Sequence, residues 1–223
     1  MTTVNEEGGS RCATTEVVVA DPADVVITFT DANLEAAIRD EIGKQSGDIT
    51  TGDVANVTRL SANSKNISNL SGIENLTALT ELFLASNQIT DISALAGLTE
   101  ISSGDLWVNQ ITDISVLANL TRLSSLSIHT NQITDISALQ NLTSLDRLLI
   151  GSNQISDISV VTGLTALQTL GINSTLVTDL TPVVDNTGIG SGDEVDVRDL
   201  SLSSDATSTQ IPALEARGVT VTQ

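Results

Sequence analysis

The chain has 223 residues, of which 40% are hydrophobic and 1% aromatic, and its net charge is −19 with an isoelectric point near 4.1. This charge excludes the basic surface that nucleic-acid binding requires, and it disfavours an anionic membrane surface. Because aromatic residues are so few, the core must be aliphatic, and the single cysteine, Cys12, excludes an intrachain disulfide.

The acidity itself has three explanations that the sequence leaves open. Solubility is the simplest. A saline habitat and the binding of divalent cations would also account for it. No stretch is long and apolar enough to cross a membrane, because the longest N-terminal apolar run, residues 17–20, is stopped by Asp21 and Pro22.

The N-terminal region predicts a cap in front of the rest of the fold. Residues 1–23 have few apolar anchors and are predicted to form a flexible lead. A short strand is expected at residues 25–29, and a helix then begins after Asp31 as N-cap and stops at Gly43. The apolar residues of one helical face are Leu34, Ala37, Ile38 and Ile42. Residues 24–53 are therefore expected to cover the first layer of the core.

The middle of the chain is repetitive. The motif Asn-Gln-Ile-(Thr or Ser)-Asp-Ile-Ser occurs at Asn87, Asn109, Asn131 and Asn153, always 22 residues apart. Leucine or isoleucine recurs at the same offsets before three of these asparagines: Leu76, Leu79, Leu82, Leu84; Leu120, Leu123, Leu126, Ile128; Leu142, Leu145, Leu148, Ile150. A fixed period of this length predicts a solenoid whose units bury their apolar faces only against each other.

The repeats are expected to cover residues 54–182, with less regular copies at both ends. Lys65 and Thr175 replace the asparagine in the first and last of them. Residues 183–223 are predicted to form a final strand and a C-terminal cap, with a helix from about residue 205 to 217 stopped by Gly218. Strands are expected at residues 195–197 and 219–221.

Each repeat is predicted to add one strand to a parallel sheet, with its leucines pointing inward. The asparagines are expected to stack inside the turn and to satisfy backbone groups that the strands leave unpaired. The aspartate of each Thr-Asp-Ile-Ser motif is expected to N-cap a short helical turn on the convex side. As an alternative, the column of these aspartates would bind cations. The aspartates are Asp91, Asp113, Asp135, Asp157 and Asp179.

The residues between and beside the inward leucines form three outward rows on the concave face of the sheet. The first row is Arg59, Glu81, Ser103, Ser125, Arg147, Thr169, Glu194. The second row is Ser61, Phe83, Asp105, Ser127, Leu149, Gly171, Asp196. The third row is Asn63, Ala85, Trp107, His129, Gly151, Asn173, Arg198.

These rows hold the unusual residues of the chain, including its only Trp and its only His. Large apolar groups normally point inward, and exposed aromatics beside Arg are typical of binding hot spots. We therefore predict a ligand-binding patch whose members are Phe83, Asp105, Trp107, Ser127, His129, Arg147 and Leu149. Ala85 and Gly151 are expected to leave room beside Trp107. In the alternative interpretation, Trp107 only covers the gap left by Gly104 at an inward leucine position.

Asp105, Ser127 and His129 include the residue types of a catalytic triad, but catalysis is not expected. Serine is abundant in this chain, and the backbone amides of a parallel sheet are already paired, which leaves no donors for an oxyanion. Asp105 and His129 alone do not make a metal site. We predict no enzymatic activity and no cofactor.

The motif L-x-x-L-x-x-L-x-L-x-x-N resembles the leucine-rich repeat, and the tail N-Q-I-T-D-I-S-x-L resembles its bacterial internalin-type form of 22 residues. This resemblance implies an α/β fold: a right-handed leucine-rich-repeat solenoid with a parallel sheet on the concave face, short helical turns on the convex face and helical caps at both ends. It also implies a secreted or bacterial cell-surface protein. We therefore expect a monomeric, non-catalytic recognition module for a protein or glycan. The alternative is a structural spacer or adhesive stalk of a surface protein.

Overall fold

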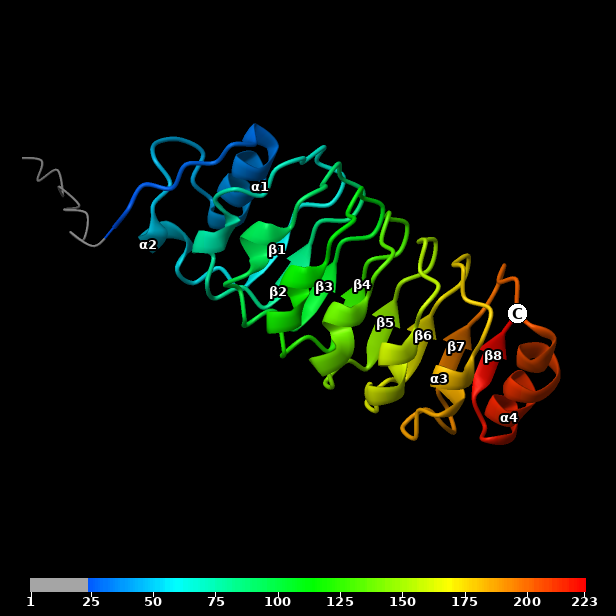
Figure 1. The fold of residues 1–223 in the computed structure, drawn as a ribbon. Helices are drawn as coiled ribbons and strands as arrows, with labels where there is room; N and C mark the ends of the chain where they lie inside the picture. The colour runs from blue at the N-terminus through cyan, green and yellow to red at the C-terminus, as the bar shows by residue number, and fades with distance from the viewer. Residues whose placement is uncertain (1–23) are drawn as a thin grey trace, which may run out of the picture.

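The computed structural model describes residues 24–223, and the predicted lead at residues 1–23, including Cys12, lies outside this range. Figure 1 shows an elongated coil in which the strands follow one another along the length of the molecule. Eight parallel strands form one sheet in chain order. They are β1 Arg59–Ser61, β2 Glu81–Phe83, β3 Ser103–Asp105, β4 Ser125–Ser127, β5 Arg147–Leu149, β6 Thr169–Gly171, β7 Glu194–Asp196 and β8 Thr220–Thr222.

Short helical turns carry the chain from one strand to the next. They are the 3-10 turns η1 Ile73–Asn75, η2 Ser93–Leu95, η3 Ser115–Asn119, η4 Ser137–Asn141 and η5 Ser159–Gly163, and the α-helix α3 Thr181–Val184. The leucines and isoleucines of the repeat lie between these turns and the sheet, and almost all of them are 0–2% exposed. The predicted α/β leucine-rich-repeat solenoid is therefore confirmed.

The stacked asparagines hold successive turns together as predicted. The Asn109 side chain donates to the carbonyls of Leu84 and Leu106, both at 3.0 Å, and accepts from the backbone N–H of Ile89 at 3.0 Å. Asn87, Asn131 and Asn153 make equivalent contacts and are also buried. Because each amide joins two neighbouring turns, the strands are held in register along this part of the sheet.

The aspartates of the repeat make a different contact from the predicted one. The Asp113 carboxylate accepts from the backbone N–H of Ser115 at 2.8 Å, and Asp91, Asp135 and Asp157 repeat this contact. The N-cap of η3 is Ile114, one residue later, so Asp113 forms an Asx turn that leads into the helix. In residues 24–223 no group of three or more His, Cys, Asp and Glu is placed to hold a metal ion.

A helical cap closes the N-terminal end of the coil. Helix α1 spans Ala32–Ile42, begins after Asp31 as N-cap and ends at Gly43, whose φ of 68° is left-handed. Asp31 also accepts from the backbone of Ser68 at 2.8 Å, which ties the cap to the first repeat. The strand predicted at residues 25–29 was wrong: it is reduced to one antiparallel bridge, Val26 to Thr50, because α2 (Thr51–Val54) begins immediately after the partner residue.

The C-terminal end is closed by the predicted helix, here made of two segments. A π-helical turn, η6 (Ala206–Gln210), runs into α4 (Ile211–Ala216), and Gly218 follows with a φ of 85°. The chain then returns to the sheet as β8, which pairs with β7. No helix in the described 200 residues is both long and apolar enough to span a membrane.

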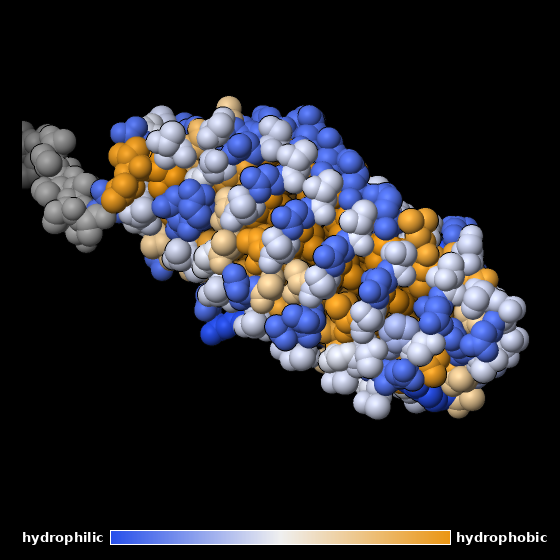
Figure 2. Space-filling view, in the orientation of Figure 1, coloured by the Kyte–Doolittle hydropathy of each residue, from blue (hydrophilic) through white to orange (hydrophobic). Residues whose placement is uncertain are grey.

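The hydropathy of the surface also follows the repeats. Figure 2 shows hydrophilic patches that recur along the molecule, with hydrophobic side chains between them. Among residues 24–223, the large hydrophobic side chains that are well exposed are Val25, Val26 and Leu176, and none of them belongs to the three outward rows.

Candidate ligand-binding face of the sheet

The register of the sheet brings the outward rows together as the sequence suggests. Phe83 pairs with Asp105, Asp105 with Ser127, and Ser127 with Leu149 on successive strands. Arg147 belongs to the first row and lies opposite Ser125. We call the surface that carries the three rows the sheet face.

The centre of the sheet face is a stacked pair of rings. The indole of Trp107 and the imidazole of His129 lie 5.1 Å apart between ring centroids, at an angle of 17°. This distance matches the spacing of neighbouring strands, so residues at the same register position can stack face to face. Both side chains are half-buried, and the His129 Nδ1 atom lies 3.2 Å from the Thr130 hydroxyl.

A second aromatic cluster lies toward the N-terminal end of the face. The Arg59 guanidinium lies 4.4 Å from the centroid of the Phe83 ring and forms an ion pair with Glu81 at 2.6 Å. Phe83 is therefore partnered by Arg59, a residue that was not among the predicted site residues. The signal was available, because Arg59 is one strand away from Phe83 in the adjacent row.

Asp105 lies beside the stacked rings in an unusual environment. Its Oδ1 atom is buried and has no hydrogen-bond partner in the described part of the chain. Burial raises the pKa of Asp105, and the nearby Trp107 N–H groups, His129 and Ser127 oppose this shift. Burial also lowers the pKa of His129, and Asp105 opposes that shift.

The structure disagrees with both interpretations that involve a glycine near Trp107. A Cβ placed at Gly104 would meet only Leu126 at 3.4 Å and Leu123 at 3.8 Å, so no atom of Trp107 lies within 4 Å of this inward position. The geometry thus argues against Trp107 as the cover for this gap. Gly151 does not leave open room, because the Asn173 side chain lies where a Cβ of Gly151 would be.

Asp105, Ser127 and His129 do not form a hydrogen-bonded relay. The His129 ring nitrogen contacts Thr130, and in residues 24–223 no hydrogen bond joins His129 to Ser127 or Asp105. The backbone around them is engaged in the parallel ladder, for example from Leu106 N–H to the Ser127 carbonyl at 2.8 Å.

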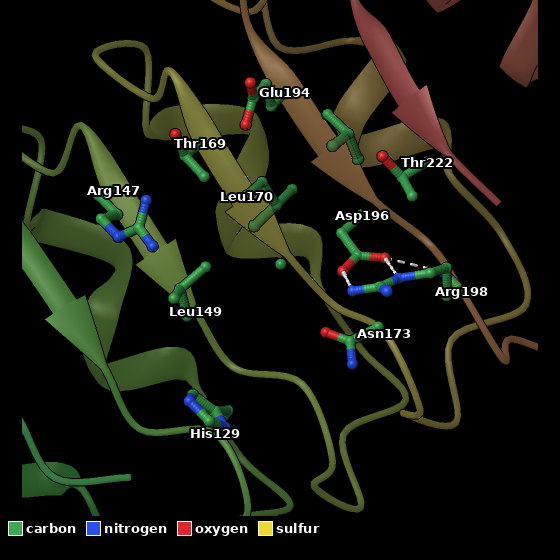
Figure 3. Close-up of a pocket in the computed structure, with 12 residues that line it drawn as sticks. His129, Arg147, Leu149, Thr169, Leu170, Asn173, Glu194, Asp196, Arg198 and Thr222 are labelled. Carbon is green, nitrogen blue, oxygen red and sulfur yellow. Dashed lines mark hydrogen bonds and ion pairs between the residues drawn. The ribbon is translucent and has the colours of Figure 1, made fainter. Parts of the chain in front are cut away.

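A hollow of about 500 Å³ opens beside this centre, toward the C-terminal end of the sheet face. Three predicted site residues line it: His129, Arg147 and Leu149. Figure 3 shows these residues with others that were not predicted as site residues: Thr169, Asn173, Glu194, Asp196, Arg198 and Thr222. Phe83, Trp107, Asp105 and Ser127 do not line this hollow.

Within the hollow, one ion pair is already complete. Arg198 donates to both carboxylate oxygens of Asp196, at 2.9 and 2.6 Å, and this contact lowers the pKa of Asp196. The sequence signal for the hollow was Gly171, an outward position without a side chain, over which Leu149 leans.

The parallel strands, the leucine layers and the asparagine ladder together define a leucine-rich repeat protein. A family model for leucine-rich repeats in two copies matches residues 55–97 and 105–141. Among solved structures, an internalin of Listeria monocytogenes (InlF) is 31% identical over 87% of this chain, with a TM-score of 0.79. Internalin C2 of the same organism is 32% identical over 87% of this chain and 94% of its own, with a TM-score of 0.67. The chain belongs to the internalin family of bacterial leucine-rich repeat proteins.

The similarity has clear bounds. The chain spans 56% of the length of the InlF structure. A plant peptide hormone receptor, RGFR1 in complex with RGF2, is 19% identical over 68% of this chain with a TM-score of 0.56, and it shares the fold alone. No curated protein matches this chain significantly. The fold and the family are those of a protein-interaction module.

Proposed function

We propose that this chain is a non-catalytic recognition module that binds a protein ligand on the concave sheet face. The contact residues would be Phe83, Asp105, Trp107, Ser127, His129, Arg147 and Leu149. The stack of Trp107 on His129 carries the proposal. In a chain with 1% aromatic residues, its only tryptophan and only histidine lie together, half-buried, on the surface of the sheet.

The physical argument concerns where large side chains belong. The aliphatic residues of the repeats fill the interior, so the core does not need Trp107. A rigid, partly exposed indole gives a partner a large contact area at a small cost in side-chain entropy, which is why Trp and Arg are frequent in hot spots. Asp105 places a carboxylate beside that indole.

The distribution of charge also supports a partner on this face. The three outward rows contain three arginines and four carboxylates, so their net charge is −1, whereas the whole chain carries −19. Most of the acidic charge therefore lies elsewhere on the molecule. A protein partner can approach the sheet face without having to compensate a large charge of one sign.

The family membership supports a bacterial protein that acts in a secreted or cell-surface setting, and we propose that it does so as a monomer. A glycan ligand is an alternative on the same surface. Aromatic faces and hydrogen-bonding side chains could hold a sugar ring as well as a peptide.

The test compares wild type with Trp107→Ala in a pull-down from extracellular proteins and on a glycan array. Leu176→Ala is the matched control, because Leu176 is 59% exposed and lies outside the three rows. We expect Trp107→Ala to lose the ligand and Leu176→Ala to retain it, with both variants folded by circular dichroism. Equal capture by all three proteins would contradict the proposal. Capture only on the glycan array would replace the protein ligand by a sugar.

A structural spacer or adhesive stalk is the second candidate. Its supporting observation is the regular exterior, in which Asp91, Asp113, Asp135 and Asp157 repeat one local contact along the coil. A spacer would be insensitive to Trp107→Ala. It would instead respond to changes in length, for example to the deletion of one 22-residue repeat.

A further inference from the structure

The first outward row contains two pairs of opposite charges that behave differently. Arg59 and Glu81 lie on adjacent strands and form an ion pair at 2.6 Å. Arg147 and Glu194 lie two strands apart, with Thr169 between them in register. In residues 24–223, neither Arg147 nor Glu194 has an ion-pair partner. The second pair is therefore free to bind charges from outside.

Both of these free charges line the hollow of about 500 Å³. Leu149, Leu170 and Gly171 contribute its apolar surface, and His129, with Trp107 stacked on it, contributes an aromatic wall. Figure 3 shows Arg147 and Glu194 on either side of Thr169. The volume falls in the range of about 300–1,000 Å³ that is typical of ligand sites. Asp196 and Arg198 also line the hollow, but they satisfy each other and so do not determine the charge of the ligand.

We propose that this hollow binds an extended peptide segment of the protein ligand, with an acidic side chain on Arg147 and a basic side chain on Glu194. The inference rests on the proposed function, because it assigns the chemistry of one part of the same surface. It adds Glu194 and Thr169 to the contact residues and predicts that the bound segment carries both charges.

A segment that carries one charge of each sign is favoured because the other three kinds of ligand can be eliminated. A neutral ligand would remove both free charges from water without a partner, which is unfavourable. A purely anionic ligand would be repelled by Glu194, which would also remain without a partner. A purely cationic ligand would leave Arg147 unpaired. A segment with one charge of each sign satisfies both residues.

The spacing fits a peptide. Two strand steps separate the α-carbons of Arg147 and Glu194 by about 9.6 Å, and side chains two residues apart on an extended peptide lie about 7 Å apart on one face. The long side chains of Arg, Glu and Lys can span the difference between these two distances. The residue between the two charged ones then points away from the sheet.

The experiment uses the full chain and capped hexapeptides. One set contains Asp-Ala-Lys or Lys-Ala-Asp at its centre, and a matched set replaces the charged residues by Asn and Gln. Trp107 is the only tryptophan, and its stacked partner His129 lines the hollow, so intrinsic fluorescence reports occupation. Calorimetry gives an independent binding constant.

We expect one of the two charged orders to bind, and the neutral peptides to bind at least tenfold more weakly. Arg147→Gln and Glu194→Gln should each weaken binding of the charged peptide by about tenfold. Arg122→Gln is the control, since Arg122 lies outside the rows and pairs with Glu100. The double variant Arg147→Glu with Glu194→Arg should prefer the opposite order of charges. These positions are exposed, so the variants should fold normally.

Several results would overturn the inference. Equal binding of charged and neutral peptides would remove its basis, as would binding that Arg147→Gln and Glu194→Gln leave unchanged. If free aspartate and free lysine bound as tightly as the charged peptides, the hollow would be a site for small molecules and not for a peptide. If the protein ligand is lost with Trp107→Ala but not with the charge variants, the inference fails while the proposed function stands. If no variant affects that ligand, both fail.

Discussion

The interior of the turn and the sheet face are built from the same repeats and differ in how strictly they repeat. Inside, Asn87, Asn109, Asn131 and Asn153 make the same contacts in four successive turns. Outside, Trp107 and His129 occupy one row and differ from their neighbours at each step. The repeated positions determine the geometry of the coil, and the varied positions determine which chemistry that geometry presents. Changes inside should therefore alter stability, and changes outside should alter binding.

The largest expected effect follows from Asn131→Ala. This side chain donates to the carbonyls of Leu106 and Ile128, at 3.1 and 2.9 Å, and accepts from Ile111 N–H at 3.0 Å, while only 6% exposed. Its removal leaves buried backbone groups unpaired, and we expect a loss of about 3–5 kcal/mol in the free energy of unfolding in urea.

The matched control for that variant is Gln132→Ala, at the next residue, whose side chain is exposed. Its effect should stay within about 0.5 kcal/mol. If Asn131→Ala were equally mild, the asparagine ladder would not be what holds the turns together, and the distinction between interior and surface would lose its main support.

The second effect concerns the end of the coil. Asp31 N-caps α1 through Asn33 N–H at 2.9 Å and also accepts from Ser68 and Asn69 of the first repeat. Asp31→Ala should cost about 2 kcal/mol at pH 7 in urea unfolding. Asp31→Asn, which keeps an acceptor, should cost less.

The pH dependence of the Asp31 effect has a definite sign. Burial would raise the pKa of Asp31, but the hydrogen bonds from Ser68, Asn33 and Leu34 together lower it below its model-peptide value of 3.8. The unfolded state then binds the proton more tightly, so the contribution is complete above about pH 4 and is lost as the pH falls through the folded-state value. A difference between wild type and Asp31→Ala that grew under acidic conditions would contradict this assignment.

A smaller effect, of opposite sign, is expected at Gly104. This glycine lies in β3 at a position that is leucine in the neighbouring strands, and a Cβ there would make ordinary contacts with Leu126 and Leu123. Gly104→Ala should raise the free energy of unfolding by about 0.5–1 kcal/mol. It should leave the fluorescence of Trp107 unchanged, because the indole does not fill this gap. A spectral shift on substitution would restore the alternative role of Trp107 as a cover.

The sequence predicts the repeated part of this molecule much better than the varied part. The 22-residue period fixes which residues point inward, and the rows of the sheet face follow from it by counting. The pairing of Trp107 with His129 and of Phe83 with Arg59 was not predicted, since a list of outward positions does not say toward which neighbour a side chain turns. That choice depends on rotamers and on the small residues beside each ring.

The hollow illustrates the same limit. Gly151 and Gly171 are both outward glycines, yet Asn173 fills the first and only the surroundings of the second remain open. Asn173 lies over Gly151 and Leu149 leans over Gly171, and no periodicity encodes the direction of either side chain. The strand predicted at residues 25–29 was wrong for a related reason: the residues suit a strand, but the partner segment ends at α2.

The smallest effect, and the most direct test of the sheet face, is the titration of His129. Burial lowers the pKa of His129 below 6.5, and the Asp105 carboxylate opposes this shift. Because a protonated imidazole quenches a stacked indole, the fluorescence of Trp107 should fall as the pH decreases, with a midpoint below 6.5. Asp105→Asn should move the midpoint lower still, because it removes the nearby negative charge, and His129→Gln should abolish the transition.

Since the folded state binds this proton less tightly than the unfolded chain, His129 stabilises the fold above about pH 6.5 and loses that contribution on acidification. A midpoint at or above 6.5, or one that Asp105→Asn does not move, would mean that the rings are not stacked beside Asp105 in solution, and the surface on which recognition is proposed would have a different shape.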